Sequence, residues 1–463
     1  MEQNNKFILG VEELNEIADK IDLGYVILIA GNPGTGKTIG ASKILYENMT
    51  KLGIKTIYVS FVETKSEYYK NLKRLGLDME ELEKKGLFTY LEEITFLNKD
   101  LIPDILNQIL NTVERTGAKI IVIDSISPLL QVTENIISLR EILHNFFYRL
   151  SKIKGITTIL IQEVPYGNEN IGFGVEEFLV DAVIFLKTVQ IKGRSIRIME
   201  IKKARGSDVS LVSIPFIIRK DKGISVLYPK NVKEKRSNKL INVVVGNNSF
   251  TISLGSQNLI IANPKIDIQA LASLIIVGAV TGTPNLSENI RRKTIIRMMS
   301  YTAEEFSSQI KNCLLNAGID KNKVDELLKS YIIDGIDANK YSLTEYFDHV
   351  NEIEEMEKPA FVLNIGLDAL IQLLADNEIY PRLELDAMIR RINNNITTLY
   401  LMNGNIKDYY SIPLGEEYDN VWYFYPYKEN RLIIKPFRLK MKIFASEKYT
   451  INLSSIKCLS RII

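Results

Sequence analysis

The sequence predicts an α/β fold with a mostly parallel central sheet, present twice along the chain. Three observations predict it. Short apolar runs alternate with helix-like segments, a glycine-rich turn follows the first apolar run, and sequence blocks from the first half recur in the second. With 463 residues the chain is also too long for one ordinary hydrophobic core, so two domains are expected.

The alternation of apolar strands and amphipathic helices begins at residue 25 and continues to about residue 162. After it, three apolar segments follow one another without helices between them, which predicts an antiparallel extension of the sheet. The expected strands are 25–30, 55–61, 119–125, 156–162, 182–190, 195–204 and 213–220, and the expected helices are 41–52, 66–75 and 138–153.

The second half of the chain repeats short blocks of the first half in the same order. ITT stands at Ile156 and at Ile396, a Glu-Glu pair stands at residues 176–177 and 416–417, and the apolar runs ending at Asp124 and Asn364 keep the same spacing. Such a series predicts a duplication. The polar segment 229–239 is expected to be a linker between domains at 1–228 and 240–463.

The composition is that of an ordinary globular protein, with 46% hydrophobic and 25% charged residues. The 58 basic and 56 acidic residues nearly cancel, which argues against a dedicated duplex-DNA-binding protein. Two cysteines and two histidines indicate neither a disulfide framework nor a zinc site, so a metal ion is expected on oxygen ligands. We find no leader-like or membrane-length apolar segment and expect a cytoplasmic protein.

A phosphate-binding loop is the strongest motif. Residues 31–38, GNPGTGKT, match G-x-x-x-x-G-K-[ST] between an expected strand and an expected helix. In such loops the glycines let backbone N–H groups point at phosphate oxygens, the lysine reaches the β- and γ-phosphates, and the hydroxyl faces Mg²⁺. The expected nucleotide-binding residues are Gly31, Asn32, Pro33, Gly34, Thr35, Gly36, Lys37 and Thr38.

A second feature of nucleotide sites is an acidic residue at the carboxyl end of a buried strand. KIIVIDS places Asp124 there. A carboxylate in that position is costly without a charged partner, and a magnesium-bound nucleotide supplies one. We therefore expect ATP and Mg²⁺ as ligands, with Thr38 and Asp124 on the metal side.

With these motifs, residues 7–228 resemble the KaiC-like ATPases of the RecA superfamily, in particular the archaeal type. The blocks that carry the resemblance are ILGVEELNEIA, LIAGNPGTGKT, FVET, VIDSISPLL, GVEEFLVDAVIFL and EIKKARGS. The resemblance implies a RecA-like core, a hexameric ring with ATP between neighbouring subunits, and slow hydrolysis used for signalling.

The resemblance also implies roles for further residues. FVET lies where the family has two adjacent glutamates that position the attacking water, and here only Glu63 remains, beside Val62. An incomplete glutamate pair implies hydrolysis that is weak or that relies on Glu63 alone. Gln162 corresponds to a γ-phosphate sensor, although a strand-end amide explains it equally well. Lys203 and Arg205 correspond to the pair that is inserted into the neighbouring subunit's site.

The second copy is expected to lack a working nucleotide site. If LIIVGAVTGTPN is matched to LIAGNPGTGKT, Pro284 and Asn285 replace Lys37 and Thr38. An interaction or ring-stabilising role then remains for this copy. The same comparison aligns the aromatic run 421–425 with the buried strand that begins at residue 182. The other equivalent positions in the two copies are Asn364 for Asp124, Tyr301 for Glu63, Met402 for Gln162, Pro436 for Lys203 and Arg438 for Arg205.

Three functions fit these features. The favoured hypothesis is a regulatory ATPase whose nucleotide state is sensed by a partner protein. The alternatives are a DNA-directed recombination or repair accessory of the RecA type, and a regulator of gas vesicles or motility. An assignment to the AAA+ class is disfavoured, because Ser125 follows Asp124 where those proteins usually have glutamate.

Overall fold

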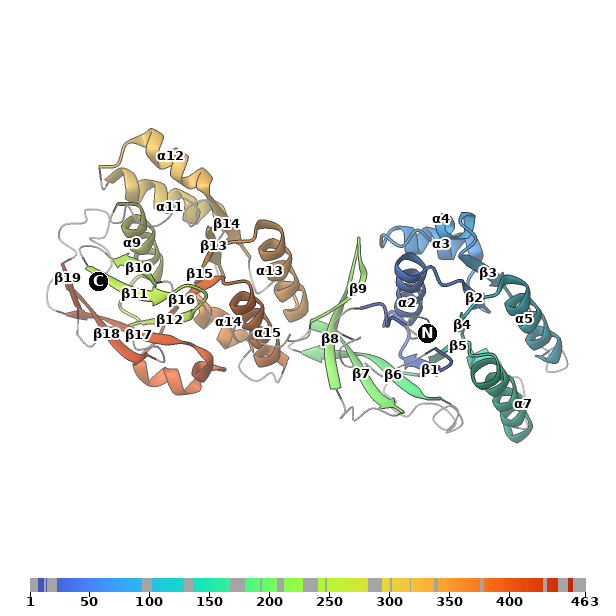
Figure 1. Ribbon diagram of the computed structural model, residues 1–463. Coiled ribbons are helices and arrows are strands. Elements are labelled where there is room, and N and C mark those ends of the chain that lie inside the picture. The colour runs from blue at the N-terminus through green and yellow to red at the C-terminus, as the bar shows by residue number, and fades with distance from the viewer. Residues whose placement is uncertain are drawn as a thin grey trace. The chain divides into compact units, whose positions relative to one another are not determined.

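The chain forms two compact units, Met1–Tyr228 and Pro229–Ile463, in this computed structural model (Figure 1). The structure describes residues 7–11, 14, 23–93, 102–128, 136–166, 180–191, 194–205, 212–227, 240–245, 248–281, 294–299, 302–316, 318–336, 340–374, 379–427, 431–439 and 449–452. The expected linker, 229–239, lies outside these residues.

The first unit is built on a nine-stranded sheet in the order β3-β2-β4-β5-β1-β6-β7-β8-β9. Strands β3 to β6 run parallel, and β7, β8 and β9 extend the sheet in antiparallel fashion. This confirms the predicted α/β class. The elements are β1 Val26–Gly31, α2 Lys37–Leu52, β2 Thr56–Ser60, α3 Lys65–Lys73, α4 Met79–Lys84, β3 Phe88–Glu92, α5 Ile102–Thr116, β4 Ile120–Asp124, α7 Ile136–Tyr148 with the π-helical turn Arg149–Ile153, β5 Thr157–Glu163, β6 Ala182–Ile191, β7 Arg194–Ala204, β8 Val212–Arg219 and β9 Gly223–Val226.

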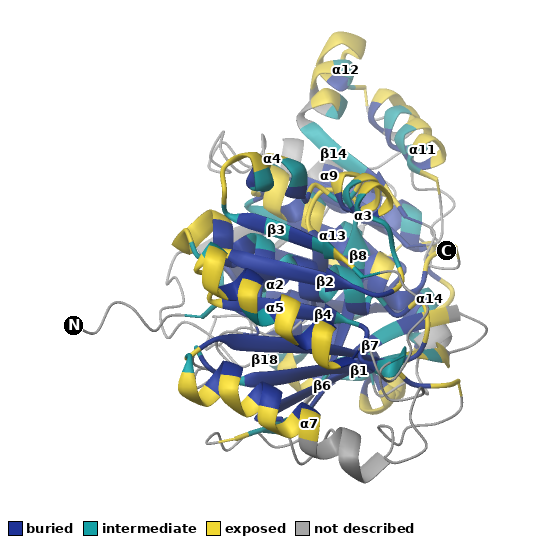
Figure 2. Cartoon of the chain, turned by 90° about the vertical axis from the view of Figure 1, so that its right-hand side faces the viewer, coloured by how far each residue is buried: buried dark blue, intermediate teal, exposed yellow. Residues whose placement is uncertain are grey.

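Both faces of this sheet are covered by apolar helix surfaces. Helices α2, α3 and α4 pack on one face, and α5 and α7 pack on the other. The strands between them are buried along most of their length, while the helices expose their outer sides (Figure 2). Burial on both faces explains why these strands are continuous apolar runs in the sequence.

The second unit repeats this architecture. Its eight-stranded sheet has the order β14-β13-β15-β16-β12-β17-β18-β19, which matches β3-β2-β4-β5-β1-β6-β7-β8 strand for strand. A β10-β11 hairpin precedes it. The elements are β10 Leu240–Val245, β11 Asn248–Ser253, β12 Gln257–Ala262, α9 Ile268–Thr281, β13 Thr294–Met298, α11 Ala303–Asn316, α12 Lys321–Ser330, β14 Tyr331–Gly335, α13 Leu343–Glu357, β15 Phe361–Ile365, α14 Leu367–Leu374, α15 Ile379–Asn393, β16 Thr397–Asn403, β17 Asn420–Tyr427, β18 Arg431–Leu439 and β19 Tyr449–Asn452.

Polar contacts at the start of the central strand are duplicated as well. The carboxylate of Asp181 accepts a hydrogen bond from the N–H of Val26 at 3.0 Å, and Asp419 accepts the same bond from Gln257 at 2.9 Å. A β-bulge also falls at the same place in the two sheets, after Val183 in β6 and after Val421 in β17. Shared irregularities of this kind support duplication of one ancestral unit more strongly than shared strand order does.

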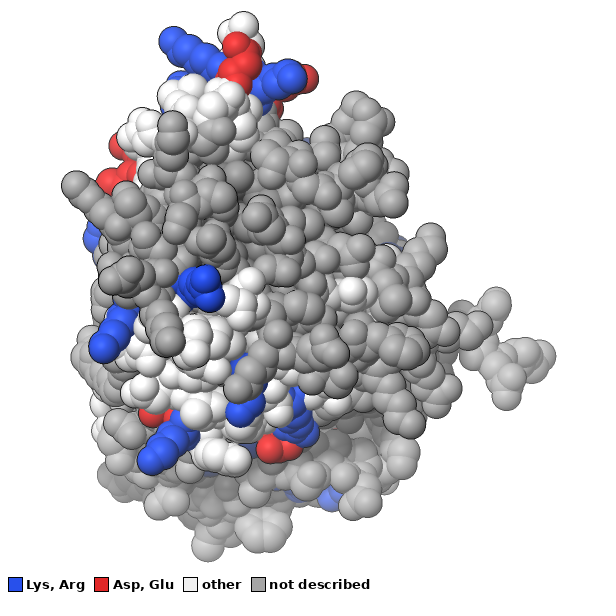
Figure 3. Space-filling view, turned by 90° about the vertical axis from the view of Figure 1, so that its left-hand side faces the viewer, with Lys and Arg blue, Asp and Glu red and all other residues white. Residues whose placement is uncertain are grey.

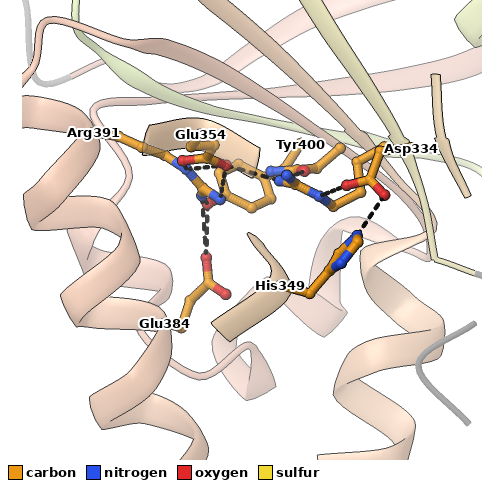
Figure 4. Close-up of polar contacts among 8 residues, drawn as sticks. Asp334, His349, Glu354, Glu384, Arg391 and Tyr400 are labelled. Atoms are coloured by element: carbon orange, nitrogen blue, oxygen red, sulfur yellow. Dashed lines mark hydrogen bonds and ion pairs between the residues drawn. The ribbon is translucent and has the colours of Figure 1, made fainter. Parts of the chain in front are cut away.

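One face of the second sheet carries a buried ionic network beside a small apolar cluster of Ile295, Val362 and Ile396 (Figure 4). Arg297 of β13 is fully buried and donates to Asp334 at 2.8 Å and to Glu354 at 2.9 Å. Arg391 of α15 donates to Glu354 at 2.8 Å and to the hydroxyl of Tyr400. The network continues from Tyr400 to Glu384, from Asp334 to His349, and from Arg297 to Asn364.

The aromatic run in β17 contributes to the core on the other face of this sheet. Trp422 and Phe424 are buried and pack against Phe250 of the hairpin, which confirms the interpretation of these two residues as core. Among the described residues, no helix is both long enough and apolar enough to cross a membrane.

We expect Glu354→Gln to destabilise the second unit by about 3–5 kcal/mol, because it leaves two buried guanidinium groups without their shared carboxylate. Burial alone raises the pKa of Glu354, but Arg391 and Arg297 hold that pKa below its ordinary value. The stabilisation is therefore present at neutral pH and is lost as the pH falls through the lowered folded-state pKa.

Fluorescence of Trp422, the single tryptophan, during urea unfolding measures this loss. The control is Glu352→Gln on the exposed side of the same helix, which should change the unfolding free energy by less than about 0.5 kcal/mol. Equal stability of the two variants would contradict the role given to the network.

Candidate phosphate-binding site

The loop between β1 and α2 has a backbone that only glycine tolerates at two points. A Cβ on Gly31 would lie 2.1 Å from the carbonyl oxygen of Leu186 in the neighbouring strand. Gly36 has a φ of 100°, and a Cβ there would lie 2.9 Å from the side chain of Ile218. These glycines let the loop fold tightly over the end of the sheet and enter α2.

The N-terminus of α2 presents backbone N–H groups that the chain does not satisfy with a side chain. Its N-cap is Gly36, which makes no side-chain capping bond, and its first turn holds no acidic residue. Helix N-termini carry a partial positive charge and up to four unpaired N–H donors. This arrangement is suited to an anion such as phosphate.

The side chain of Lys37 is buried at the same point. It is 6% exposed, and its ammonium donates to the carbonyl oxygen of Asn32 at 3.0 Å. Burial lowers the pKa of Lys37, although the charges of Glu163 and Asp124 counteract this effect. Asn32 is in turn fixed by hydrogen bonds from its amide to the carbonyls of Val164 and Pro165, so the lysine rests on an anchored loop.

The carboxylate of Asp124 lies beside this loop, as the sequence predicts. The hydroxyl of Thr38 donates to its Oδ2 at 2.7 Å, and the hydroxyl of Tyr58 donates to the same oxygen at 2.5 Å. Burial raises the pKa of Asp124, and hydrogen bonds from Tyr58 and Thr38 and the charge of Lys37 offset part of that rise.

These groups fit a magnesium ion. A hydroxyl and a carboxylate are hard oxygen ligands, and Mg²⁺ is usually held by one or two such groups together with substrate phosphates. A cation at this place would also relieve the burial of the Asp124 charge. Among the described residues no group of three or more His, Cys, Asp or Glu forms a separate metal cage.

Glu63 lies at the end of β2, one strand away from Asp124 in the sheet. Its N–H donates to the hydroxyl of Ser60 at 2.9 Å, and its carboxylate accepts a hydrogen bond from Asn71 at 2.7 Å. Burial raises the pKa of Glu63, and the bond from Asn71 partly offsets the rise. Val62, at the first glutamate position of the family, is 69% exposed and has no polar group to offer.

The carboxyl end of β5 adds two polar residues to this edge of the sheet. Gln162 pairs with Ala30 in the strand register and is buried, and Glu163 pairs with Gly31 and is exposed. Sequence reasoning identified Gln162 but missed Glu163, which acts electrostatically on both Lys37 and Asp124. Glu163 could have been identified from its position at the end of a buried strand next to the phosphate loop, where Asp124 also stands.

Lys203 and Arg205 lie at the opposite edge of the sheet from the phosphate loop. Ala204 pairs with Ala182, which is level with Ile27 at the start of β1. The loop begins four residues further along, about 13 Å away at the usual rise of a strand. Arg205 is bonded to Asp181 at 3.0 Å in this position, so the structure does not bring it to the loop of its own chain.

The second unit has a counterpart of the loop, but not where the sequence comparison placed it. Residues 274–281 lie inside helix α9, and Pro284, Asn285 and Tyr301 lie outside the described residues. The register of β12 against β16 makes ANPKIDIQ, residues 262–269, the counterpart of GNPGTGKT. Ile268 therefore occupies the position of Lys37, and Gln269 that of Thr38.

The anion-binding end of the helix is capped internally in this counterpart. Asp267, at the position of Gly36, accepts hydrogen bonds from the N–H groups of Gln269 at 2.9 Å and Ala270 at 3.1 Å. Ile266 fills the place of Thr35 and is buried. A carboxylate of the chain thus takes the donors that a phosphate would need, and its negative charge opposes a second anion.

Three further sequence equivalences are corrected by the strand registers. The residue level with Asp124 is Ile365, whereas Asn364 faces the other side of the sheet and joins the ionic network. Arg438 is level with Lys203, and Pro436 with Ile201. The match of Met402 to Gln162 holds. In each corrected pair, a one- or two-residue difference in loop length between the two copies shifts the match made from sequence.

Known proteins resemble the first unit. A family model described as "ATPase: KaiC" matches residues 8–231. A UPF0273 protein of Thermotoga maritima is 30% identical over 224 residues, which cover 46% of this chain and 90% of that protein. A UPF0273 protein of Pyrococcus horikoshii is 28% identical over 244 residues, 49% of this chain and 94% of that protein. The circadian clock protein KaiC3 of Synechocystis is 27% identical over 261 residues, and the chain spans about half, 51%, of its length.

Lys37→Ala should weaken ATP binding by 100-fold or more, about 3 kcal/mol, since it removes the buried cation aimed at the phosphates. Isothermal titration calorimetry measures the affinity. Lys51→Ala is the matched control, because this lysine is on the same helix, is 61% exposed and pairs with Glu47 at the far end. If both variants bind ATP like the wild type, the site assignment is wrong.

Proposed function

The chain belongs to the KaiC-like family of RecA-superfamily ATPases, and from this premise we propose that its first unit binds Mg-ATP, hydrolyses it slowly and signals its nucleotide state to a partner protein. The observation that carries the proposal is the convergence of Lys37, Thr38 and Asp124 on an uncapped helix N-terminus. Each of these groups is suited to one part of a magnesium-bound triphosphate.

Slow hydrolysis is proposed because Glu63 acts without a second glutamate. Its backbone is fixed by Ser60 and by Tyr90, whose hydroxyl donates to the Glu63 carbonyl at 2.7 Å. Its carboxylate bonds only to Asn71 among the hydrogen bonds described, at 2.7 Å, and Asn71 is exposed. Such a carboxylate has the freedom to turn toward a water molecule at the γ-phosphate. With Val62 beside it, no other acid at this turn supports the step.

Assembly of several chains is proposed from the position of Lys203 and Arg205. Since the antiparallel β7 carries them to the far edge of the sheet, a nucleotide can reach them only on another chain. Arg205 is 62% exposed, so its ion pair with Asp181 is worth at most about 1 kcal/mol and does not prevent transfer to a neighbour. Asp181 keeps Val26 and Lys152 as partners after such a transfer. A hexameric ring, as the resemblance implies, satisfies this geometry.

For the second unit we propose a structural and interaction role without nucleotide. Its loop counterpart has an internal carboxylate cap from Asp267, and isoleucines stand at positions 266 and 268, where Thr35 and Lys37 stand in the first unit. Retention of the whole sheet, despite the loss of the chemistry, favours a role in shape or in contacts with other subunits.

A DNA-directed function is the alternative and finds less support. On the face of the second unit shown in Figure 3, the visible Lys and Arg side chains are scattered, and some of them lie beside Asp or Glu. Among the described residues of this unit, Lys311 forms an ion pair with Asp325 at 2.6 Å. A DNA-binding surface gathers positive charge and produces a steep dependence of affinity on salt. Single-strand binding that falls steeply between low and moderate salt would favour the alternative.

We expect one ATP per chain, because among the described residues only the first unit offers an uncapped helix end with a lysine. Calorimetry of the wild type should give a stoichiometry near one, and Lys37→Ala should leave no second, weaker site. A stoichiometry of two, with one of the two sites unaffected by Lys37→Ala, would show that the second unit also takes nucleotide.

Hydrolysis should require residues from two chains. Arg205→Ala and Glu63→Gln should each bind ATP and each lose turnover, Arg205→Ala by a factor on the order of 10³ or more. A mixture of the two variants should recover activity, because some interfaces pair an intact Arg205 with an intact Glu63. Phosphate release measures turnover, and sedimentation confirms that the variants co-assemble. An inactive mixture of co-assembled chains would refute the arrangement.

A further inference from the structure

A cluster of three tyrosines lies under the metal side of the site. Tyr58 of β2, Tyr68 of α3 and Tyr90 of β3 form this tyrosine cluster. The rings of Tyr58 and Tyr90 are stacked with centroids 5.7 Å apart, and Tyr68 packs against both at 4.5 and 4.9 Å. Tyr58 and Tyr68 are 1% exposed, so neither ring can contact a nucleotide directly.

The hydroxyls of Tyr58 and Tyr90 bond to residues of the candidate site, and that of Tyr68 bonds to a residue of helix α2 outside it. Tyr58 donates to Asp124 at 2.5 Å, and Tyr90 donates to the carbonyl of Glu63 at 2.7 Å. Tyr68 pairs at 2.8 Å with the hydroxyl of Ser42, which donates to the carbonyl of Thr38. Three segments that are remote in sequence are thereby fixed to one rigid set of rings.

The contact of Tyr58 with Asp124 controls which carboxylate oxygen is available. Thr38 and Tyr58 both donate to Oδ2, and the two bonds hold the carboxylate at a defined rotation. Both of these bonds use Oδ2, which leaves Oδ1 as the oxygen available to a metal ion or its water. Groups that hydrogen-bond to a metal ligand in this way set its orientation and affect metal affinity strongly.

The second unit provides an internal comparison for simple core packing. The residue of β13 level with Tyr58 is Ile296, which fills the same fully buried place. In that unit the residue level with Asp124 is Ile365. An aliphatic side chain therefore suffices for core packing at this position. The tyrosine hydroxyl is present in the unit that has the carboxylate and absent from the unit that lacks it.

We propose that Tyr58 is a positioning residue, which fixes the Asp124 carboxylate in the rotation that nucleotide-bound Mg²⁺ requires. The inference rests on the proposed function, because it assumes that Asp124 faces the metal of a bound nucleotide. Tyr58 does not itself contact the ligand. Its hydroxyl, rather than its ring, orients the carboxylate of Asp124.

The test is Tyr58→Phe, which removes one hydroxyl and keeps the ring. Calorimetry with a non-hydrolysable ATP analogue, in EDTA and in MgCl₂, gives the factor by which Mg²⁺ tightens binding. We expect that factor to fall about tenfold in Tyr58→Phe and the affinity in EDTA to stay unchanged. Tyr68→Phe is the matched control: it removes an equally buried hydroxyl that bonds to Ser42 instead, and it should keep the wild-type factor.

A double-mutant cycle separates positioning from general packing. In an Asp124→Asn background, Tyr58→Phe should produce no further change in the Mg²⁺ factor, because the group on which it acts has gone. An unchanged factor in Tyr58→Phe, an equal loss in Tyr68→Phe, or unfolding of Tyr58→Phe at 25 °C would overturn the inference. If the wild type itself binds the analogue equally with and without Mg²⁺, the proposed function fails instead.

Discussion

The buried carboxylate of Asp124 is the group on which the first unit's site depends. A negative charge at the end of an apolar strand is unfavourable by itself, and the surrounding structure compensates for it with hydroxyls from Thr38 and Tyr58 and with the charge of Lys37. These donors come from α2 and β2, so the two elements and β4 must keep their relative positions. Because these elements are held in place, the N-terminus of α2 and Lys37 lie beside Asp124, where together they can bind a polyanion.

The two units solve the same electrostatic problem in opposite ways. The first leaves positive potential at the N-terminus of α2 and the carboxylate of Asp124 beside it, an arrangement that a magnesium nucleotide complements. The second balances its charges internally, with Asp267 at the helix end and with Arg297 and Arg391 shared among buried acids. The two units thus share one strand order and differ in how their buried charges are balanced. In the second unit the partners are residues of the chain, and in the first we propose that a ligand supplies them.

Much of this was accessible from the sequence, for definite physical reasons. Strand runs, the loop GNPGTGKT and Asp124 follow from local patterns, and the structure places them together as predicted. Equivalences in the second copy were harder, because small insertions shift the spacing between strands. Two dipeptides of the first copy do recur, since Leu254-Gly255 repeats Leu23-Gly24 and Asn263-Pro264 repeats Asn32-Pro33. They do not stand out as parts of a phosphate loop, because no lysine follows at the expected position. The hydroxyl of Tyr58 was beyond prediction, since an apolar strand position gives no sign of what its tip contacts.

The internal cap of the second loop also limits what a single substitution can restore. With Asp267 bonded to the N–H groups at the helix end, a lysine restored at position 268 would still meet an occupied anion site, whose carboxylate repels a phosphate. A nucleotide site in this half would need changes at Asp267, Ile268 and Ile365 together. Under the role proposed for this half, a single reversion at the lysine position therefore does not restore nucleotide binding.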